Sequence, residues 1–574
     1  MADLGLAAAN GLAFLLCVIF LGYVSLIFVP FLRHRPSTPG DEHTLQWHFL
    51  VPCRDEEAVI ERTVSGLLDS FPSAHVWAVD DASEDATLAI LRRLEQQSPR
   101  VHVVARTAPQ ARQGKGAALN AGWRVIDAAI PPTQPRDLVA VSVVDADAVL
   151  DPQALALISG PLFFGDPDVG AVQILVRVRP DPFRAADDQP SIPRRSRLLI
   201  ALQDLEFTGP IAAMQMLRSN TGSVAMGGNG QFTRLSVLNR VAEQHGTPWH
   251  GALLEDFELG LHVLLAGSRT AYCHDTYVIQ EGVPTSRGLL RQRSRWAQGS
   301  MQCLRYLRDV LHTPHLSSGG TLEIAYFLFS PWVQLVGGVV YATLFSSAAY
   351  YAASDPLGVG HWWGGGAWGI LPLFVLFGLS PFMLWAHMYR SRVRPELRLW
   401  QAMGLGLANS GYVYFHQAAT WWAFYRVMTA RTDWKKTVRY SLPQHAAAPS
   451  LPMPAPVSAI RAPAEAFARL RAGSTDPVPL AAAPADRTGS PALLRLRQQS
   501  STAAWSTSYG VARRSDRAIA GLRTAPPGQR ARDSDSVPTN QDNALWCAPD
   551  CPPASPPDRS SDIYRSPQPA TASH

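Results

Sequence analysis

The stretch Leu138-Val-Ala-Val-Ser-Val-Val-Asp145-Ala-Asp147 gives the strongest indication of fold in this 574-residue chain. Its β-branched run from Leu138 to Val144 predicts a buried strand that ends in two carboxylates one residue apart. Side chains at positions i and i+2 share one face of an extended strand, so both carboxylates are expected to approach one ion. Hard oxygen ligands of this kind suit Mg²⁺ or Mn²⁺, which usually also coordinate substrate phosphates. Solvated acids in a turn are the alternative interpretation.

Three further β-branched runs precede this strand, and helical patterns separate all four. These runs are His48 to Val51, Val76 to Val79 and Val101 to Ala105. The alternation predicts an α/β domain over residues 44–311 with a parallel sheet and crossover helices. Ligands of open α/β sheets bind at the carboxyl ends of the strands, where acidic or glycine-rich segments follow several of these runs.

Acidic motifs follow the first two of these strands. Val51-Pro52-Cys-Arg-Asp55-Glu-Glu57 places a proline where the first strand should end and acids where the next helix should begin. Val79-Asp-Asp81 places two carboxylates after the second strand, where they would accept hydrogen bonds from a base or a ribose. Capping of the following helices is the alternative for both motifs.

The motif Gly114-Lys115-Gly116 places a cation and two flexible backbone positions before a predicted helix. Lys115 would neutralise phosphate charge there, with help from the amides of the helix N-terminus. The motif lacks the spacing of a Walker sequence, which argues against a P-loop.

Two later motifs offer a base and an anion-binding group. Leu254-Glu255-Asp256 lies at the start of a helical pattern, and a carboxylate there is either a helix cap or the natural base for an acceptor hydroxyl. Gln292-Arg-Ser-Arg295-Trp296 lies in an Arg-rich helical segment. Arg can clamp phosphate bidentately and Trp offers an apolar face to a sugar ring. A basic amphipathic helix on anionic lipid is the alternative.

Apolar runs flank the α/β domain on both sides. Leu6 to Leu32 and Ile324 to Tyr351 are each long enough to cross a hydrocarbon core of about 30 Å, and so is Trp368 to Tyr389. A Gly/Trp-rich turn, Gly358 to Gly366, is expected between the second and third runs. Basic residues after the first and third runs predict a cytoplasmic catalytic domain in a multi-pass protein of the plasma membrane.

The stretch Leu399 to Met428 is less apolar, and basic residues lie on both sides of it. A single crossing would put one basic cluster outside, so a tight hairpin or an interfacial segment is expected. Residues 441–574 are rich in Ala, Pro, Ser and Arg, which predicts a disordered tail. The expected division is therefore 1–35 as an N-terminal transmembrane helix, 44–311 as the catalytic domain, 312–440 as the transmembrane or interfacial region, and 441–574 as the tail.

Composition excludes several other classes of protein. The formal net charge of +5 is small for this length, and much of the basic excess borders apolar runs, which favours membrane orientation over nucleic-acid binding. The six cysteines are few and scattered, which argues against a disulfide scaffold. The apolar runs are few and nearly free of acids, which argues against a transporter.

The order of these motifs resembles that of the inverting family 2 glycosyltransferases, in particular the membrane-bound branch of cellulose, hyaluronan, chitin and poly-N-acetylglucosamine synthases. The resemblance covers about residues 50–437 and includes Gly227-Gly-Asn229-Gly-Gln-Phe232 and Trp434-Lys-Lys-Thr437. It implies a GT-A-like nucleotide-sugar-binding domain between transmembrane helices. Leu254 departs from the family pattern, because a Thr is common there.

The resemblance also implies a role for each candidate site residue. It makes Asp256 the general base with Glu255 in support, and it places the divalent cation, Mg²⁺ or Mn²⁺, on Asp145 and Asp147. The remaining residues would bind substrates: Asp55 and Asp81 the nucleoside, Lys115 the diphosphate, Asp145 the donor, and Gln292, Arg295 and Trp296 the diphosphate and the acceptor sugar.

The implied reaction is transfer of a sugar from UDP-glucose or UDP-N-acetylglucosamine to a growing β-linked polysaccharide, with inversion. Single-sugar transfer to a membrane lipid is an alternative, and a catalytically inactive membrane scaffold is another. The expected partners are a nucleotide-sugar donor, a glycan or glycolipid acceptor and the lipid bilayer, without nucleic acid.

Overall fold

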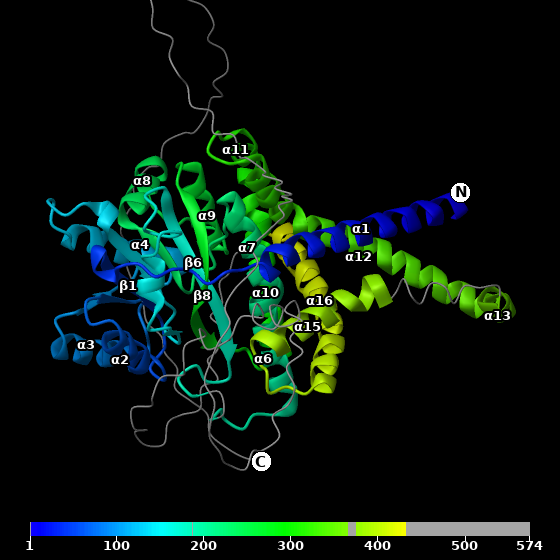
Figure 1. The fold of residues 1–574 in the computed structure, drawn as a ribbon, viewed down its shortest axis with the longest axis horizontal. Coiled ribbons are helices and arrows are strands. Elements are labelled where there is room, and N and C mark those ends of the chain that lie inside the picture. Colours follow the sequence, from blue (N-terminus) through cyan, green and yellow to red (C-terminus); the bar gives the residue numbers. More distant parts are fainter. Residues whose placement is uncertain (1, 186–187, 365–374, 432–574) are drawn as a thin grey trace, which may run out of the picture. The chain divides into compact units, whose positions relative to one another are not determined.

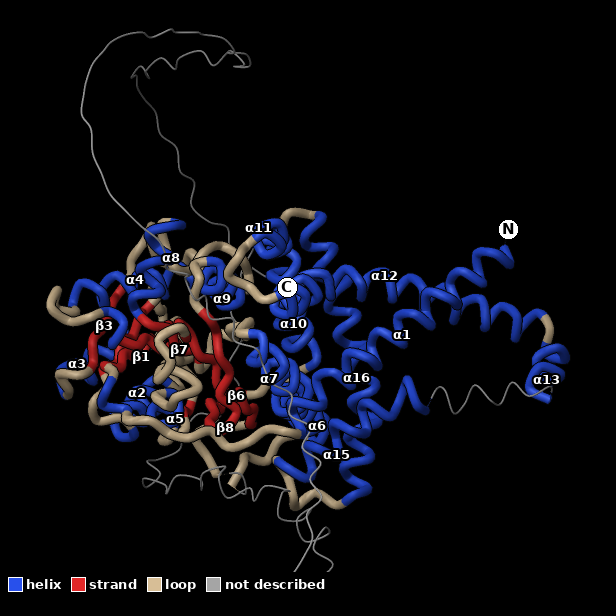
Figure 2. The backbone as a smooth tube through the Cα atoms, turned by 45° about the horizontal axis from the view of Figure 1, so that its top comes forward, coloured by secondary structure: helices blue, strands red, loops and turns tan. Residues whose placement is uncertain are grey.

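The computed structural model describes residues 2–185, 188–364 and 375–431. Its centre is an eight-stranded mixed sheet in the order β3-β2-β1-β4-β7-β6-β8-β5 (Figure 2). Strands β1 to β4 pair in parallel, whereas β7 is antiparallel to both of its neighbours. The strand bounds are β1 Gln46–Cys53, β2 His75–Asp80, β3 Val101–Ala105, β4 Val139–Val143, β5 Val149–Leu150, β6 Val169–Arg179, β7 Gln231–Arg234 and β8 Arg269–Glu281.

The four strands expected from the sequence are confirmed, with one correction. Pro52 does not end β1 but pairs with Val79 of β2. The ladder between β1 and β4 stops at Leu50, so the missing N–H of Pro52 interrupts no bond on that side.

Helices cover both faces of the sheet because side chains along each strand alternate between them. On one face Leu50 and Val79 pack with Leu119 and Ile126 of α4. On the other face Phe49 and its neighbours pack with helices α2, α3 and α5. The helices between residues 46 and 312 are α2 Ile60–Ser70, α3 Thr87–Gln97, α4 Lys115–Ala129, α5 Ala154–Ile158, α6 Arg194–Glu206, α7 Ala212–Thr221, α8 Leu235–His245, α9 Glu255–Leu265, α10 Ser286–Cys303 and α11 Leu307–His312.

The acidic cluster after β1 does not begin the next helix, contrary to expectation. Asp55 lies in a loop with a left-handed backbone (φ 53°), and α2 begins only at Ile60. The side chain of Asp55 accepts a hydrogen bond from the backbone of Glu84, at 2.8 Å, so this loop is tied to the loop after β2 instead.

Two helices are long and apolar enough to cross a membrane within the described residues, and they lie at residues 8–32 and 318–354. They belong to α1 (Ala2–Leu32) and α12 (Ser318–Ser354), which lie side by side and extend away from the sheet (Figure 1). Glu323 of α12 accepts hydrogen bonds from Tyr23 of α1 and from Arg218 of α7. This buried group joins both apolar helices to the catalytic domain.

The C-terminal helices differ from the sequence expectation in two places. Leu399–Met428 is one continuous helix, α16, and not a tight hairpin. It contains no proline, and α10 and α15 (Ser380–Arg392) pack along it, so tertiary contacts favour an unbroken helix. The expected turn at residues 358–366 begins as helix α13, Pro356–Gly364. The predicted tail, the motif at residues 434–437 and residues 368–374 of the third apolar run lie outside the described residues.

Acidification is expected to destabilise this domain through two buried histidines. His48 accepts a hydrogen bond from the Trp77 indole, at 2.9 Å, which requires an unprotonated ring nitrogen. Burial lowers the pKa of His48 and of His262 to about 3. The unfolded chain, with a histidine pKa near 6.5, therefore binds more protons between pH 6.5 and 3, and stability is lost as the pH falls through that window.

At pH 5 this amounts to about 2 kcal/mol for each histidine, taken as about 1.5 pH units below the unfolded pKa. Thermal unfolding of the detergent-solubilised protein at pH 7.5 and at pH 5 measures it. His48→Asn keeps an acceptor for Trp77 and should lose part of the acid sensitivity. An unchanged pH dependence in that variant would remove His48 from the explanation.

Candidate active site

The two carboxylates after β4 lie in a turn and not on an extended strand. The strand ends at Val143, and the backbone N–H of Ala148 closes the turn on the carbonyl of Asp145, at 2.9 Å. Asp145 is partly exposed, whereas Asp147 is buried and accepts a hydrogen bond from the backbone of Glu281, at 3.1 Å. The two side chains therefore differ in access, although both are at the carboxyl edge of the sheet.

Lys115 was predicted to lie just before a helix and is in fact the first residue of α4, where its side chain points to carboxylates. Its Nζ lies 3.0 Å from Asp145 Oδ1 and 3.8 Å from Asp256 Oδ2. Burial alone would lower the pKa of Lys115, but the charges of Asp145, Asp256 and Glu255 outweigh it and raise that pKa. Lys115 therefore stays charged and links the turn after β4 to the start of α9.

Asp256 is a buried carboxyl group with few partners. It is 7% exposed, and its Oδ1 has no hydrogen-bond partner among the described residues. Burial raises the pKa of Asp256 to about 7; Lys115 opposes that rise, and Glu255 adds to it. A carboxyl group whose pKa lies near neutrality is matched to proton transfer at physiological pH.

The structure argues against the helix-cap interpretation of Asp256. Helix α9 begins at Glu255, and the residue in the capping position is Leu254. In the described structure no side chain caps this helix. Asp256 is thus the second residue of α9, where its charge is favoured by the helix dipole without a capping bond.

The loops after β1 and β2 hold the two acids predicted to bind the nucleoside. Asp81 is 6% exposed, and its Oδ1 accepts hydrogen bonds from the guanidinium of Arg106 and from the backbone of Arg112. The carboxylate of Asp80 accepts a hydrogen bond from the backbone N–H of Ser83. Helix α3 begins at Thr87 and has no side-chain cap in the described structure, so Asp80 and Asp81 do not cap it. The two loops form one hydrogen-bonded unit at the carboxyl edge.

Helix α10 carries the third group of predicted residues. Gln292, Arg295 and Trp296 are all half-buried, and Arg295 lies close enough to Asp256 to lower its pKa. The Trp296 ring is covered by the guanidinium of Arg293, 4.1 Å from the ring centroid. Arg293 is itself buried and bonded to Glu206 of α6, at 2.6 Å.

The site therefore has a compact centre and an outer part. Lys115, Asp145 and Asp256 interact directly or through charge, with Glu255 and Arg295 beside them. Sequence reasoning missed Arg106 and Arg293; each pairs with an acid far away in sequence, so no local pattern identifies it.

Within the described ranges no cluster of three or more His, Cys, Asp or Glu side chains is arranged to hold a metal ion. The protein itself offers the oxygen atoms of Asp145 and Asp147. This donor set is chemically suited to a hard divalent cation that completes its coordination with phosphate oxygens and water.

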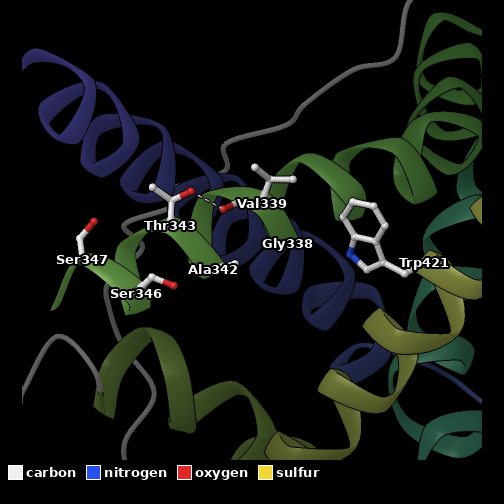
Figure 3. Close-up of a pocket in the computed structure, with 7 residues that line it drawn as sticks. All are labelled: Gly338, Val339, Ala342, Thr343, Ser346, Ser347 and Trp421. Carbon is white, nitrogen blue, oxygen red and sulfur yellow. Dashed lines mark hydrogen bonds between the residues drawn. The ribbon is translucent and has the colours of Figure 1, made fainter. Parts of the chain in front are cut away.

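A separate groove of about 540 Å³ lies between α12 and α16 (Figure 3). Small side chains of α12 line it, and the Trp421 indole of α16 stands at one end. None of the predicted site residues lines this groove.

The mixed sheet, the acids at its carboxyl edge and the buried carboxyl at the start of α9 all lie between residues 46 and 281. Residues 46–299 match the family described as glycosyltransferase like family 2.

Two curated proteins are each similar to about half of this chain. The chain is 32% identical over 280 residues to beta-monoglucosyldiacylglycerol synthase of Synechocystis sp.. The aligned region covers 47% of this chain and 51% of that protein. It is 26% identical over 268 residues to poly-beta-1,6-N-acetyl-D-glucosamine synthase of Staphylococcus aureus. That aligned region covers 46% of this chain and 56% of the synthase. The chain thus spans about half the length of the curated relatives it matches.

Among solved structures, a mannosyltransferase of Pyrobaculum calidifontis in complex with GDP-Man and Mn²⁺ is similar, with 17% sequence identity and a TM-score of 0.47. The similarity covers 75% of this chain and 100% of that chain.

Proposed function

We propose that this protein is a membrane-bound hexosyltransferase that uses a uridine diphospho-sugar and inverts the anomeric centre. The observation that carries the proposal is the buried carboxyl of Asp256, whose pKa is raised to about 7 beside Lys115 and the turn after β4. The family 2 domain at residues 46–299 supports the reaction class. The two long apolar helices support attachment to the bilayer.

In the proposed reaction Asp256 accepts the proton of the acceptor hydroxyl. The acceptor oxygen then forms a bond to the anomeric carbon while the bond from that carbon to the diphosphate oxygen breaks. The nucleoside diphosphate leaves with the electron pair. Lys115 and Arg295 supply positive charge near the diphosphate, where negative charge develops. Asp55 and Asp81 would hold the nucleoside, and Gln292 and Trp296 would contact the acceptor.

Asp145 and Asp147 would hold a divalent cation together with the donor diphosphate. When bound, such an ion stabilises the charge of the leaving group. Asp145 is the more exposed of the two and is paired with Lys115 in this form. Glu255 would assist binding next to the base.

A membrane lipid is the acceptor that the comparisons favour. The more similar of the two relatives described above carries diacylglycerol in the name of its product. A growing polysaccharide is the second candidate, because the other relative is named as a synthase of a β-1,6-linked polymer. Membranes containing the full chain, incubated with radiolabelled UDP-glucose or UDP-N-acetylglucosamine, distinguish them. Label extracted into organic solvent supports the lipid, and label in ethanol-insoluble polymer supports the polysaccharide.

Transfer is expected to require Mg²⁺ or Mn²⁺. Excess chelator should abolish incorporation of label, and addition of either cation should restore it. Without a cation the negative charges of Asp145 and Asp147 would repel the donor diphosphate. The measurement is radiolabel transfer by membranes with and without EDTA. Full transfer in excess chelator would show that Asp145 and Asp147 have another role.

A further inference from the structure

The loop before β7 lies against the carboxyl group assigned as base. It consists of residues 227–230, Gly227-Gly228-Asn229-Gly230, and Gly228 has a left-handed backbone with φ 83°. A Cβ atom added to Gly228 would lie 2.6 Å from the carboxyl carbon of Asp256 and closer still to its Oδ2. The backbone of Gly228 therefore forms one wall of the Asp256 pocket.

The same loop is fixed to the turn after β4. Asn229 is buried, and its side-chain oxygen accepts the backbone N–H of Asp145 at 3.2 Å. The backbone N–H of Gly230 donates to the carbonyl of Val143 at 3.0 Å. The loop thus spans the distance between the proposed cation site and the proposed base.

A buried amide holds the loop from its other side. The Gln173 side chain on β6 donates to the carbonyl of Asn229 at 2.9 Å and accepts from the N–H of Gly227 at 2.8 Å. Gln173 is 3% exposed, so both bonds form away from water. Main-chain atoms on both sides of Gly228 are therefore fixed by buried groups, which makes its position rigid.

We propose that Gly228 is a positioning residue for Asp256: its backbone, fixed through Asn229 to Asp145, sets where the Asp256 carboxylate can lie relative to the donor. This inference rests on the proposed function and specifies how the base is held. Asp256 has little else to hold it, since its Oδ1 has no partner in the described part of the chain and Lys115 is 3.8 Å from Oδ2. Contact with a rigid backbone replaces hydrogen bonds as the means of orientation.

The test is Gly228→Ala in the full chain, assayed in membranes with the donor and acceptor that the wild type uses. We expect kcat to fall about 10²-fold with little change in KM for the donor, because a displacement of about 1 Å at a reacting group costs about that factor. Gly246→Ala is the matched control: Gly246 also has a left-handed φ, of 85°, but nothing lies within 4 Å of an added Cβ. It should lose some thermal stability and keep its rate.

A double-mutant cycle shows whether Gly228 acts through Asp256. In the Asp256→Asn background, Gly228→Ala should cause little further loss of kcat. An equal loss in both backgrounds would overturn the proposal, and so would a normal kcat in Gly228→Ala while Asp256→Asn is slow. Normal turnover in Asp256→Asn alone would overturn the proposed base as well.

If Gly228→Ala fails to fold, the thermal stability of a double variant tests whether Gly228 contacts Asp256. Asp256→Ala removes the carboxylate that the new methyl group would meet, so the pair Gly228→Ala with Asp256→Ala should recover a folded protein and a higher Tm than Gly228→Ala alone. Failure of Asp256→Ala to restore folding would show that the left-handed backbone, and not contact with Asp256, fixes the glycine.

Discussion

Replacing Asp256 by Asn is expected to lower turnover by about 10²–10⁴-fold and to leave donor binding nearly unchanged. An amide cannot accept the acceptor proton usefully, whereas its shape and size match those of the carboxylate. The structure strengthens this expectation, because Asp256 is buried, its pKa is raised to about 7, and it caps no helix in the described structure. Steady-state transfer rates and UDP binding to the purified variant measure the two effects.

The pH dependence of the wild type provides a second measurement of the same group. Because the base must be deprotonated, kcat/KM should rise with pH through about 7, the pKa to which burial brings Asp256. Because the charge of Glu255 adds to the rise in that pKa, Glu255→Gln should move the increase in kcat/KM to lower pH while Asp256 remains as the base. A folded, inserted Asp256→Asn with near-normal turnover would exclude Asp256 from the mechanism.

The parallel half of the sheet was predictable from sequence, because β1, β2 and β4 are buried and contain β-branched runs. Strands β5 to β8 were not predicted, and the sheet is mixed and not parallel as expected. All four predicted strands form, and only the end of β1 was placed too early, at Pro52. Proline was expected to end the strand because it lacks a backbone N–H. The pairing of β1 with β4 already stops at Leu50, so Pro52 interrupts no hydrogen bond to β4 and remains in β1. The distribution of basic residues predicted a tight hairpin or an interfacial segment at residues 399–428, and the hairpin is wrong because this stretch is one helix, α16. That distribution contains no information about the packing of α10 and α15 along the helix.

The sequence predicted which acidic and basic residues gather at the candidate site, but not how buried they are or which of them are in contact. The order of motifs placed Lys115, Asp145 and Asp256 at the edge of one sheet, where they meet. It did not show that Asp256 is buried, because burial depends on the loop of Gly228, which reaches it from another part of the chain. Nor did it show that Arg106 occupies one oxygen of Asp81, since the pair forms only when β2 and β3 lie together.

Replacing Asp204 by Ala is expected to destabilise the protein by about 3–5 kcal/mol. Asp204 is 4% exposed and accepts four hydrogen bonds. Two come from the Arg177 guanidinium, at 3.0 and 3.1 Å, one from the backbone of Val178, at 2.9 Å, and one from the Tyr389 hydroxyl, at 2.8 Å. Burial alone would raise the pKa of Asp204, but the charge of Arg177 outweighs it and lowers that pKa, so the carboxylate stays ionised.

The size of this effect follows from what the substitution leaves behind. Without Asp204 the Arg177 guanidinium remains buried without its partner, and α15 loses the bond that joins Tyr389 to α6 and β6.

Tyr389→Phe removes one donor only and should cost about 1 kcal/mol. Glu61→Ala removes the partner of Arg93 at 2.8 Å, but both of those side chains are about half exposed, so it should change stability by less than about 0.5 kcal/mol. Thermal unfolding in detergent would compare the three variants. A Tm for Asp204→Ala equal to that of Glu61→Ala would show that the buried ion pair does not hold α15 to the catalytic domain.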